Sequence, residues 1–283
     1  MFKDSKSLEI SCYVLGAGAF GLFFRWMQLM LAYNEAGLPD KSVWNVLVPV
    51  IILIAAFVFR SFVKKDEKAG LVLSENFFEA FRNEGKIFSV VRWAVGIITA
   101  AGAVLLFAGC ELDRDVKFLK ILAIFGVLAG ISFPLLLTCA NKPYATKGAT
   151  LNLLSFFPIL LFATWILTAY KQNSINPILW DFVVEVLTLI VCITAFYYIA
   201  GFAYGVVNTK RCMFFCMMGA MLCIMSLSDK RYIGQQIMLG GCAFMLLTCN
   251  WIMIANLRNT KEEETGFEPE EESEEDEIVE RVN

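Results

Sequence analysis

Eight long apolar stretches, separated by short polar segments, dominate this chain. Most are close to the roughly 20 residues that a helix needs to cross a hydrocarbon core about 30 Å thick, where only a closed structure satisfies the backbone groups. We therefore predict an all-α fold, a polytopic transmembrane helix bundle of about eight spans. The seventh stretch is the shortest. The predicted spans cover residues 10-33, 43-63, 88-108, 118-139, 149-170, 179-204, 212-227 and 233-257.

The longest loop, residues 64-87, carries an amphipathic pattern between the second and third spans. Apolar side chains recur there at helical spacing, and charged side chains fall on the opposite face. The pattern predicts an interfacial helix near 73-85 on the cytoplasmic side, with a plain connector helix as the alternative. Asn76 followed by Glu79 fits the start of a helix. The apolar residues are Leu73, Phe77, Phe78 and Phe81, and the charged residues are Glu75, Glu79 and Arg82.

The net charge of -3 hides a division into a basic body and an acidic tail. Residues 1-260 hold 22 Lys and Arg against 15 Asp and Glu, whereas residues 261-283 hold 2 against 12. A segment so charged and so poor in apolar residues cannot offset the entropy of folding. We predict a transmembrane bundle over 1-260 and a disordered acidic cytoplasmic tail over 261-283. The tail is either a docking segment for a basic protein partner or a solubilising terminus.

The distribution of basic residues predicts the orientation of the bundle. If both termini are cytoplasmic, fourteen Lys and Arg residues flank the spans on the cytoplasmic side and seven on the outer side. Such an excess is typical of cytoplasmic loops. We therefore expect a multi-pass protein of the cell membrane with its N-terminus and C-terminus inside, which requires an even number of spans.

The composition narrows the possible chemistry. The chain has 58% apolar residues and a mean hydropathy of +0.63, so lipid must surround much of it. Histidine is absent, which removes the commonest general base and metal ligand. The nine cysteines fall mostly in apolar spans, where they are interpreted as small buried hydrophobic residues and not as a disulfide framework.

Two kinds of motif carry no chemistry in this context. The run Gly16-Ala17-Gly18-Ala19-Phe20-Gly21 matches the dinucleotide fingerprint, but it lies within a predicted span and not at a strand-to-helix turn. Small residues on a membrane helix allow close approach of a neighbour, so we interpret this run as a packing surface. The same interpretation applies to Gly126 with Gly130 and to Gly201 with Gly205.

The sequence evidence for a metal site is also weak. Cys212 and Cys216 are four residues apart, but no second pair and no histidine accompanies them. Glu111, Asp113 and Asp115 crowd one outer loop without a dedicated ligand pattern. We assign no metal, no cofactor and no catalytic residue, and nothing in the sequence indicates a nucleic-acid partner.

Arg25 is the most costly residue in the chain, because it lies deep in the first span, where an unpaired charge costs a few kcal/mol or more. At about 1.5 Å per residue, it lies about 8 Å below the outer surface, and Glu185 in the sixth span lies about 9 Å below it. Equal depth and opposite charge predict an ion pair, with Gln28 and Asp181 one turn away. The alternative is that Arg25 extends to the headgroups. The pair would either mark a substrate pathway or be structural.

The segments Arg25-Trp26-Met27-Gln28-Leu29 and Tyr33-Asn34-Glu35-Ala36-Gly37-Leu38-Pro39 resemble the first span and loop of uncharacterised polytopic membrane proteins of anaerobic Gram-positive bacteria. The resemblance covers a dozen or so residues. It implies a bacterial cytoplasmic membrane, and it implies no activity or binding residue.

Three functions are compatible with these features. We rank first a permease or carrier of a small solute, because intramembrane charges commonly mark pathways. A non-enzymatic membrane subunit or sensor, which recruits a protein partner through the acidic tail, is the alternative. A membrane-embedded enzyme ranks last, since no recognisable carboxylate pair or activated nucleophile is present. For all three functions, the lipid bilayer is the main environment and partner of the protein.

Overall fold

The structure, a computed structural model, describes residues 2-32, 43-68, 70-83, 85-110, 116-142, 148-173 and 179-259. Within these ranges, eight helices are long and apolar enough to cross a membrane, which confirms the predicted fold class and the position of every predicted span. They are α1 (Phe2–Leu31), α2 (Val43–Lys68), α4 (Lys86–Gly109), α5 (Val116–Cys139), α6 (Gly148–Asn173), α7 (Leu179–Ala203), α8 (Thr209–Met225) and α9 (Ile233–Ala255). The chain is a multi-pass membrane protein, and the predicted tail lies outside the described residues.

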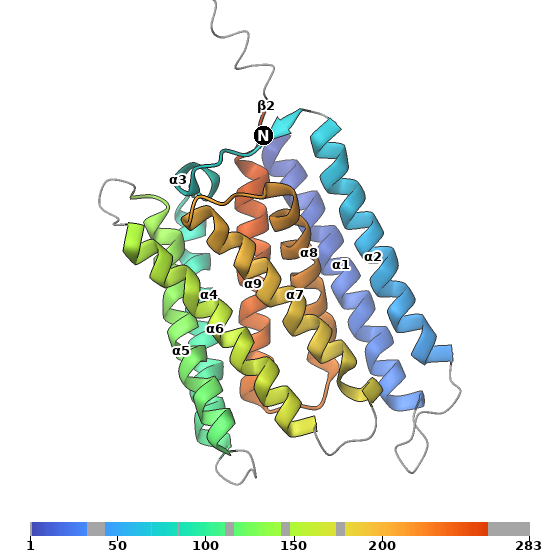
Figure 1. Ribbon diagram of the computed structural model, residues 1–283. Coiled ribbons are helices and arrows are strands. Elements are labelled where there is room, and N and C mark those ends of the chain that lie inside the picture. Colours follow the sequence, from blue (N-terminus) through green and yellow to red (C-terminus); the bar gives the residue numbers. More distant parts are fainter. Residues whose placement is uncertain are drawn as a thin grey trace, which may run out of the picture.

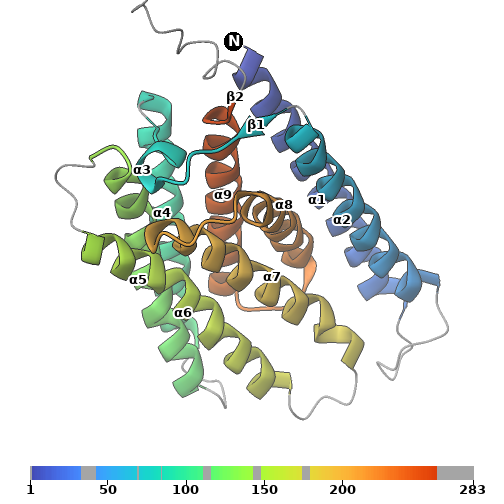
Figure 2. The same cartoon turned by 45° about the horizontal axis from the view of Figure 1, so that its top comes forward.

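The last two helices form the centre of the bundle (Figure 1). α8 packs against α1, α2, α7 and α9, whereas α9 also packs against α4. The most apolar parts of α8 and α9 are 67% and 72% buried, against 17% for α2, which lies at the periphery. Figure 2 shows α4, α5 and α6 on one side of this centre and α1 with α2 on the other. The shortest predicted span is therefore one of the two helices at the centre of the bundle.

Sulfur-containing side chains make up much of the buried surface of α8 and α9. Methionine and cysteine pack well in such irregular spaces because they are small or flexible. All nine cysteines are free and seven of them are buried, which confirms their interpretation as hydrophobic residues. The buried sulfur-containing residues of the two helices are Cys212, Met213, Cys216, Met217, Met218, Met221, Cys223, Met225, Met238, Cys242, Met245, Cys249 and Met253.

Glycines allow the closest helix contacts. A Cβ atom on Gly130 of α5 would lie 2.7 Å from the backbone nitrogen of Ala100 in α4, and one on Gly126 would lie 2.7 Å from the Cβ of Ala103. The predicted packing role of this pair is confirmed. Gly205, in contrast, lies after the end of α7 and has a φ of 74°, so it forms a turn. It is not part of a groove with Gly201, and that prediction was wrong.

The segment between α2 and α4 differs from the predicted interfacial helix. Within the described part of this segment, residues 70-83, only α3 (Phe77–Ala80) is helical, and its cap Asn76 accepts a side-chain hydrogen bond from the backbone of Phe78 at 3.1 Å. Phe77 and Phe81 are buried, and the ring of Phe81 lies 5.3 Å from that of Phe202 in α7. The apolar side chains of this segment therefore pack against the helices of the bundle and cover its end.

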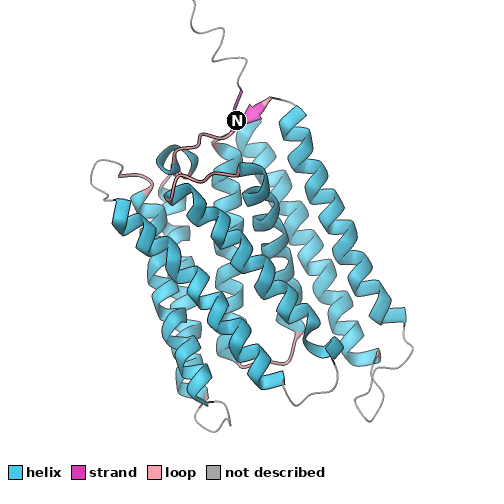
Figure 3. Cartoon of the chain, viewed as in Figure 1, coloured by secondary structure: helices cyan, strands magenta, loops and turns pink. Residues whose placement is uncertain are grey.

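Two short strands close the same end. β1 (Leu71–Val72) pairs antiparallel with β2 (Arg258–Asn259), and the two strands are magenta in Figure 3. Asn256 adds hydrogen bonds to the carbonyl oxygens of Ala80 and Arg82 at 2.9 and 3.0 Å. Residue 259 and the start of α1 thus lie at one end of the bundle, as an even number of spans requires.

Candidate functional site

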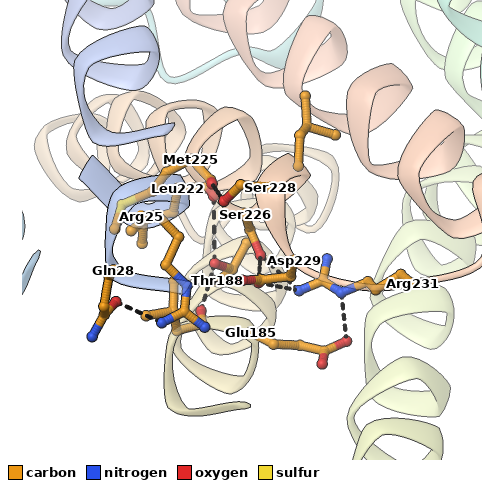
Figure 4. A network of polar contacts seen from close by, with 12 residues as sticks. Arg25, Gln28, Glu185, Thr188, Leu222, Met225, Ser226, Ser228, Asp229 and Arg231 are labelled. Carbon is orange, nitrogen blue, oxygen red and sulfur yellow. Dashed lines mark hydrogen bonds and ion pairs between the residues drawn. The ribbon is translucent and has the colours of Figure 1, made fainter. Parts of the chain in front are cut away.

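A cluster of charged side chains lies inside the bundle near the end opposite the start of α1 and β2 (Figure 4). Arg25 of α1 has no exposed side-chain surface. Its Nε lies 2.8 Å from Oδ1 of Asp229, and its Nη1 donates a hydrogen bond to Oε1 of Gln28 at 2.7 Å. Gln28 in turn donates from Nε2 to Oδ1 of Asn45 in α2 at 2.9 Å. Arg25 therefore faces the protein interior and does not extend to the lipid surface.

Asp229 stands between two guanidinium groups. Its Oδ2 accepts hydrogen bonds from Nη2 of Arg231 at 2.9 Å and from Oγ of Ser226 at 2.8 Å. The same Nη2 of Arg231 lies 2.7 Å from the Ser226 hydroxyl. Hydrogen bonds to ionised groups are roughly twice as strong as neutral ones, so these contacts fix the turn between α8 and α9.

Glu185 of α7 binds the other side of Arg231. Its Oε1 lies 3.1 Å from Nε of Arg231, a distance typical of an ion pair, although the N–H direction does not make a regular hydrogen bond. Glu185 also interacts electrostatically with Asp229 and Arg25, and Trp165 of α6 is another polar neighbour. The four charged side chains are at most 11% exposed, and among them the positive and negative charges are equal.

The short length of α8 explains why this turn lies inside the bundle. The seventeen residues of α8 alone rise about 26 Å, which is less than the roughly 30 Å hydrocarbon core, so the span reaches crossing length only with the turn up to Ser228. A 3-10 turn, η1 (Ser226–Ser228), follows directly, so Asp229 lies within the bundle. The side chain of Gln236 binds the carbonyl oxygens of Leu227 and Asp229 at 3.4 and 3.2 Å, which satisfies backbone groups that water would otherwise bind.

The structure brings the predicted residues Arg25, Gln28 and Glu185 into one cluster but gives each charge a different nearest partner. Asp229 is the carboxylate bound to Arg25, and Arg231 is the cation bound to Glu185. Asp181 belongs to α7, and its side chain lies outside the described residues. Asp229 and Arg231 were missed because they follow a span and resemble ordinary loop residues. The unusual shortness of that span was the available signal.

Two side chains of this region keep buried donors without a hydrogen-bond partner. They are Nη1 of Arg231 and Nε2 of Gln235, which lies in the first turn of α9, whereas Nε1 of Trp165 has the Glu185 carboxylate as its neighbour but makes no regular hydrogen bond to it. An unsatisfied buried donor costs about 1–3 kcal/mol. The arrangement therefore has donor capacity that a ligand bearing acceptor oxygens could use.

The other sequence motifs do not form a second site. A Cβ atom on Gly18 would lie 3.0 Å from Ile224, and one on Gly21 would lie 3.2 Å from Met225, so this run packs α1 against α8 as predicted. Cys212 and Cys216 are buried, and the described residues hold no group of three potential metal ligands. The acidic residues 111, 113 and 115, and the loop with Glu35, lie outside the described residues.

Comparisons with known proteins assign no family to this chain, since it matches no protein-family model, no curated protein and no solved structure. The site must therefore be interpreted from its geometry.

The hydroxyl of Ser226 should contribute measurably to the stability of the cluster. Ser226→Ala removes a donor to Asp229 and an acceptor for Arg231, and we expect the free energy of unfolding in detergent to fall by about 1–3 kcal/mol. Ser228→Ala is the matched control, because its hydroxyl binds only the Met225 carbonyl oxygen at 3.1 Å. Equal effects of the two substitutions would contradict the role assigned to Ser226.

Proposed function

We propose that this protein is a carrier of a small solute that bears acceptor oxygens, such as a carboxylate. The solute would bind beside the Arg231 and Glu185 contact. The observation that carries the proposal is a balanced cluster of four buried charges within spanning helices, next to donors that have no partner. Charged residues inside a membrane bundle are costly and commonly mark substrate pathways.

The arrangement of the donors favours an anionic or carbonyl-rich solute. Arg231 uses Nη2 for Asp229 and Ser226, whereas its Nη1 stays available. Trp165 can donate only through Nε1. A carboxylate or similar group between these donors would gain charge-assisted hydrogen bonds, and Glu185 would then compete with the solute for Arg231. Such competition would couple solute binding to movement of α7 relative to α9.

The membrane location is part of the proposal. The excess of basic residues at the end that carries the chain termini supports a cell membrane with both termini inside. The site would then open toward the outer side, because Arg25 lies six residues before the end of α1, about 9 Å along the helix.

A binding screen followed by transport tests this function. The purified protein is heated in detergent with a panel of carboxylates, phosphate esters, amino acids and inorganic ions, and a ligand of the native state raises the melting temperature. We expect a hit among the oxygen-rich anions, and we expect uptake of that solute into proteoliposomes.

Trp165→Phe is the most informative variant for this screen. It keeps an aromatic ring beside Phe162, with which Trp165 stacks at 6.2 Å, but removes the Nε1 donor. We expect about tenfold weaker solute binding, equivalent to one lost hydrogen bond, with little change in the ligand-free melting temperature. Lys230→Gln is the control, since Lys230 is exposed next to Arg231. No ligand-induced shift across the panel, or a hit unaffected by Trp165→Phe, would refute the proposed site.

A further inference from the structure

A second polar site lies at the other end of the bundle, where α1 begins and β2 lies. An open pocket of about 580 Å³ is lined by the end of α2, the end of α7 and the start of α8. Four cations line it, and no acidic residue is among its lining residues. The cations are Arg60 and Lys64 from α2 with Lys210 and Arg211 from α8. This concentration of positive charge points to an anionic occupant.

Local structure at the start of α8 adds to the positive potential. Asn208 caps this helix, because its side chain accepts a hydrogen bond from the backbone of Arg211 at 3.2 Å. The first turn of a helix carries a partial positive charge and free backbone N–H groups. Nη1 of Arg211 also donates to the hydroxyl of Tyr198 at 3.4 Å, which positions the guanidinium at the cavity wall.

Apolar surface continues from the cations toward the middle of the bundle. Lys64 and Arg60 are one helical turn apart on α2, and Phe57 and Leu53 follow on the same face at spacings of three and four residues. Phe57 and Leu53 are 74% and 69% exposed. On the opposite wall, Phe214 lies one turn below Lys210. The site therefore combines a cationic end with an apolar surface, the pattern of an amphiphile-binding site.

We propose that this cavity binds the phosphate headgroup of an anionic glycerophospholipid, with an acyl chain along the exposed face of α2. Basic pockets between membrane helices at the cytoplasmic side suit such headgroups, and the charge distribution places this end of the bundle there. The binding is independent of the proposed solute site, which lies at the opposite end of the bundle.

The acidic segment 261-283 is the main competing occupant. It follows β2 at the same end of the bundle and carries ten excess negative charges. The lipid is favoured because the apolar face of α2 adjoins the cations. A segment so rich in glutamate has few apolar side chains that could pack on Phe57 and Leu53.

The test is a binding titration of the full chain in neutral detergent. Fluorescent phosphatidylglycerol is compared with fluorescent phosphatidylcholine, and inorganic phosphate is added separately as a competitor. We expect saturable binding of phosphatidylglycerol with an increase in the melting temperature, no saturable binding of phosphatidylcholine, and little competition by inorganic phosphate.

Paired charge variants locate the binding. Arg60→Gln with Lys64→Gln should weaken phosphatidylglycerol binding about 25-fold, since each cation near an anionic lipid contributes about fivefold. Lys65→Gln with Lys68→Gln removes the same charge from the same helix end, but neither lysine lines the cavity, so its effect should stay within about twofold.

Three results would overturn the proposal. Equal losses in the two double variants would indicate general surface attraction, and efficient competition by inorganic phosphate would indicate a phosphate site without a lipid. Binding that emerges only after deletion of residues 261-283 would assign the cavity to the acidic segment.

Discussion

Replacing Arg25 by methionine is expected to lower the free energy of unfolding by about 3–5 kcal/mol. Methionine keeps an unbranched side chain of similar length but removes the guanidinium that binds Asp229 at 2.8 Å and Gln28 at 2.7 Å. Asp229 would then keep only Arg231 and Ser226, and the polar end of Gln28 would lose its nearest donor. A buried charge that loses its partner is costly because water does not replace the contact.

The measurement is reversible unfolding in mixed micelles, with two comparisons. Lys117→Met removes an exposed cation near the same end of the bundle and should change stability by about 0.5 kcal/mol or less. Combining Arg25→Met with Asp229→Asn should cost less than the sum of the single changes, because both charges of one pair then disappear together. If Arg25→Met matched the Lys117 control, Arg25 would be satisfied by headgroups and the ion pair would be energetically unimportant.

The sequence predicted that Arg25 and Glu185 lie near each other but not which side chains they pair with. Counting residues placed Arg25 and Glu185 at similar depth, and both do occur in one cluster. The pairing depends on Asp229 and Arg231, whose depth is set by where α8 ends and not by their own surroundings in the sequence. Hydropathy identifies a span, but it does not reveal that the turn after a short central span is buried inside the bundle.

The same limit explains the segment after α2. The alternation of phenylalanine and charge in residues 73-82 indicates correctly that one face is apolar. It does not distinguish lipid from protein as the surface that buries this face. Phe81 packs against Phe202, far away in the chain, and such a contact depends on the final arrangement of α7. Local patterns therefore predicted each of the eight spanning helices, whereas tertiary contacts decided how the polar residues and connecting segments pair.

Gly234→Ala is expected to destabilise the contact between α9 and α4 by at least about 2 kcal/mol. A Cβ atom at Gly234 would lie 2.5 Å from the carbonyl oxygen of Gly102 and 2.7 Å from the Cα of Leu106. Both atoms belong to the backbone, so no side-chain rotation can relieve the overlap, and inserting an atom into a well-packed contact typically costs 1–3 kcal/mol or more. The helices must move apart to accommodate the methyl group.

Gly240→Ala on the same helix is the matched control. No atom lies within 4 Å of a Cβ at that position, and alanine favours a helix over glycine by about 1 kcal/mol, so this variant should be as stable as the parent or more stable. Thermal unfolding of both variants in detergent measures the difference.

The position of Gly234 also connects this contact to the proposed solute site. It lies three residues after Arg231, so a displaced α9 would shift the guanidinium relative to Glu185. We therefore expect Gly234→Ala to weaken solute binding, and Gly240→Ala to leave it unchanged. Loss of stability without loss of binding would mean that the turn at 226-231 holds Arg231 by its own hydrogen bonds, independently of where α9 packs. Loss of both would mean that the contact between α4 and α9 sets the geometry of the charged cluster.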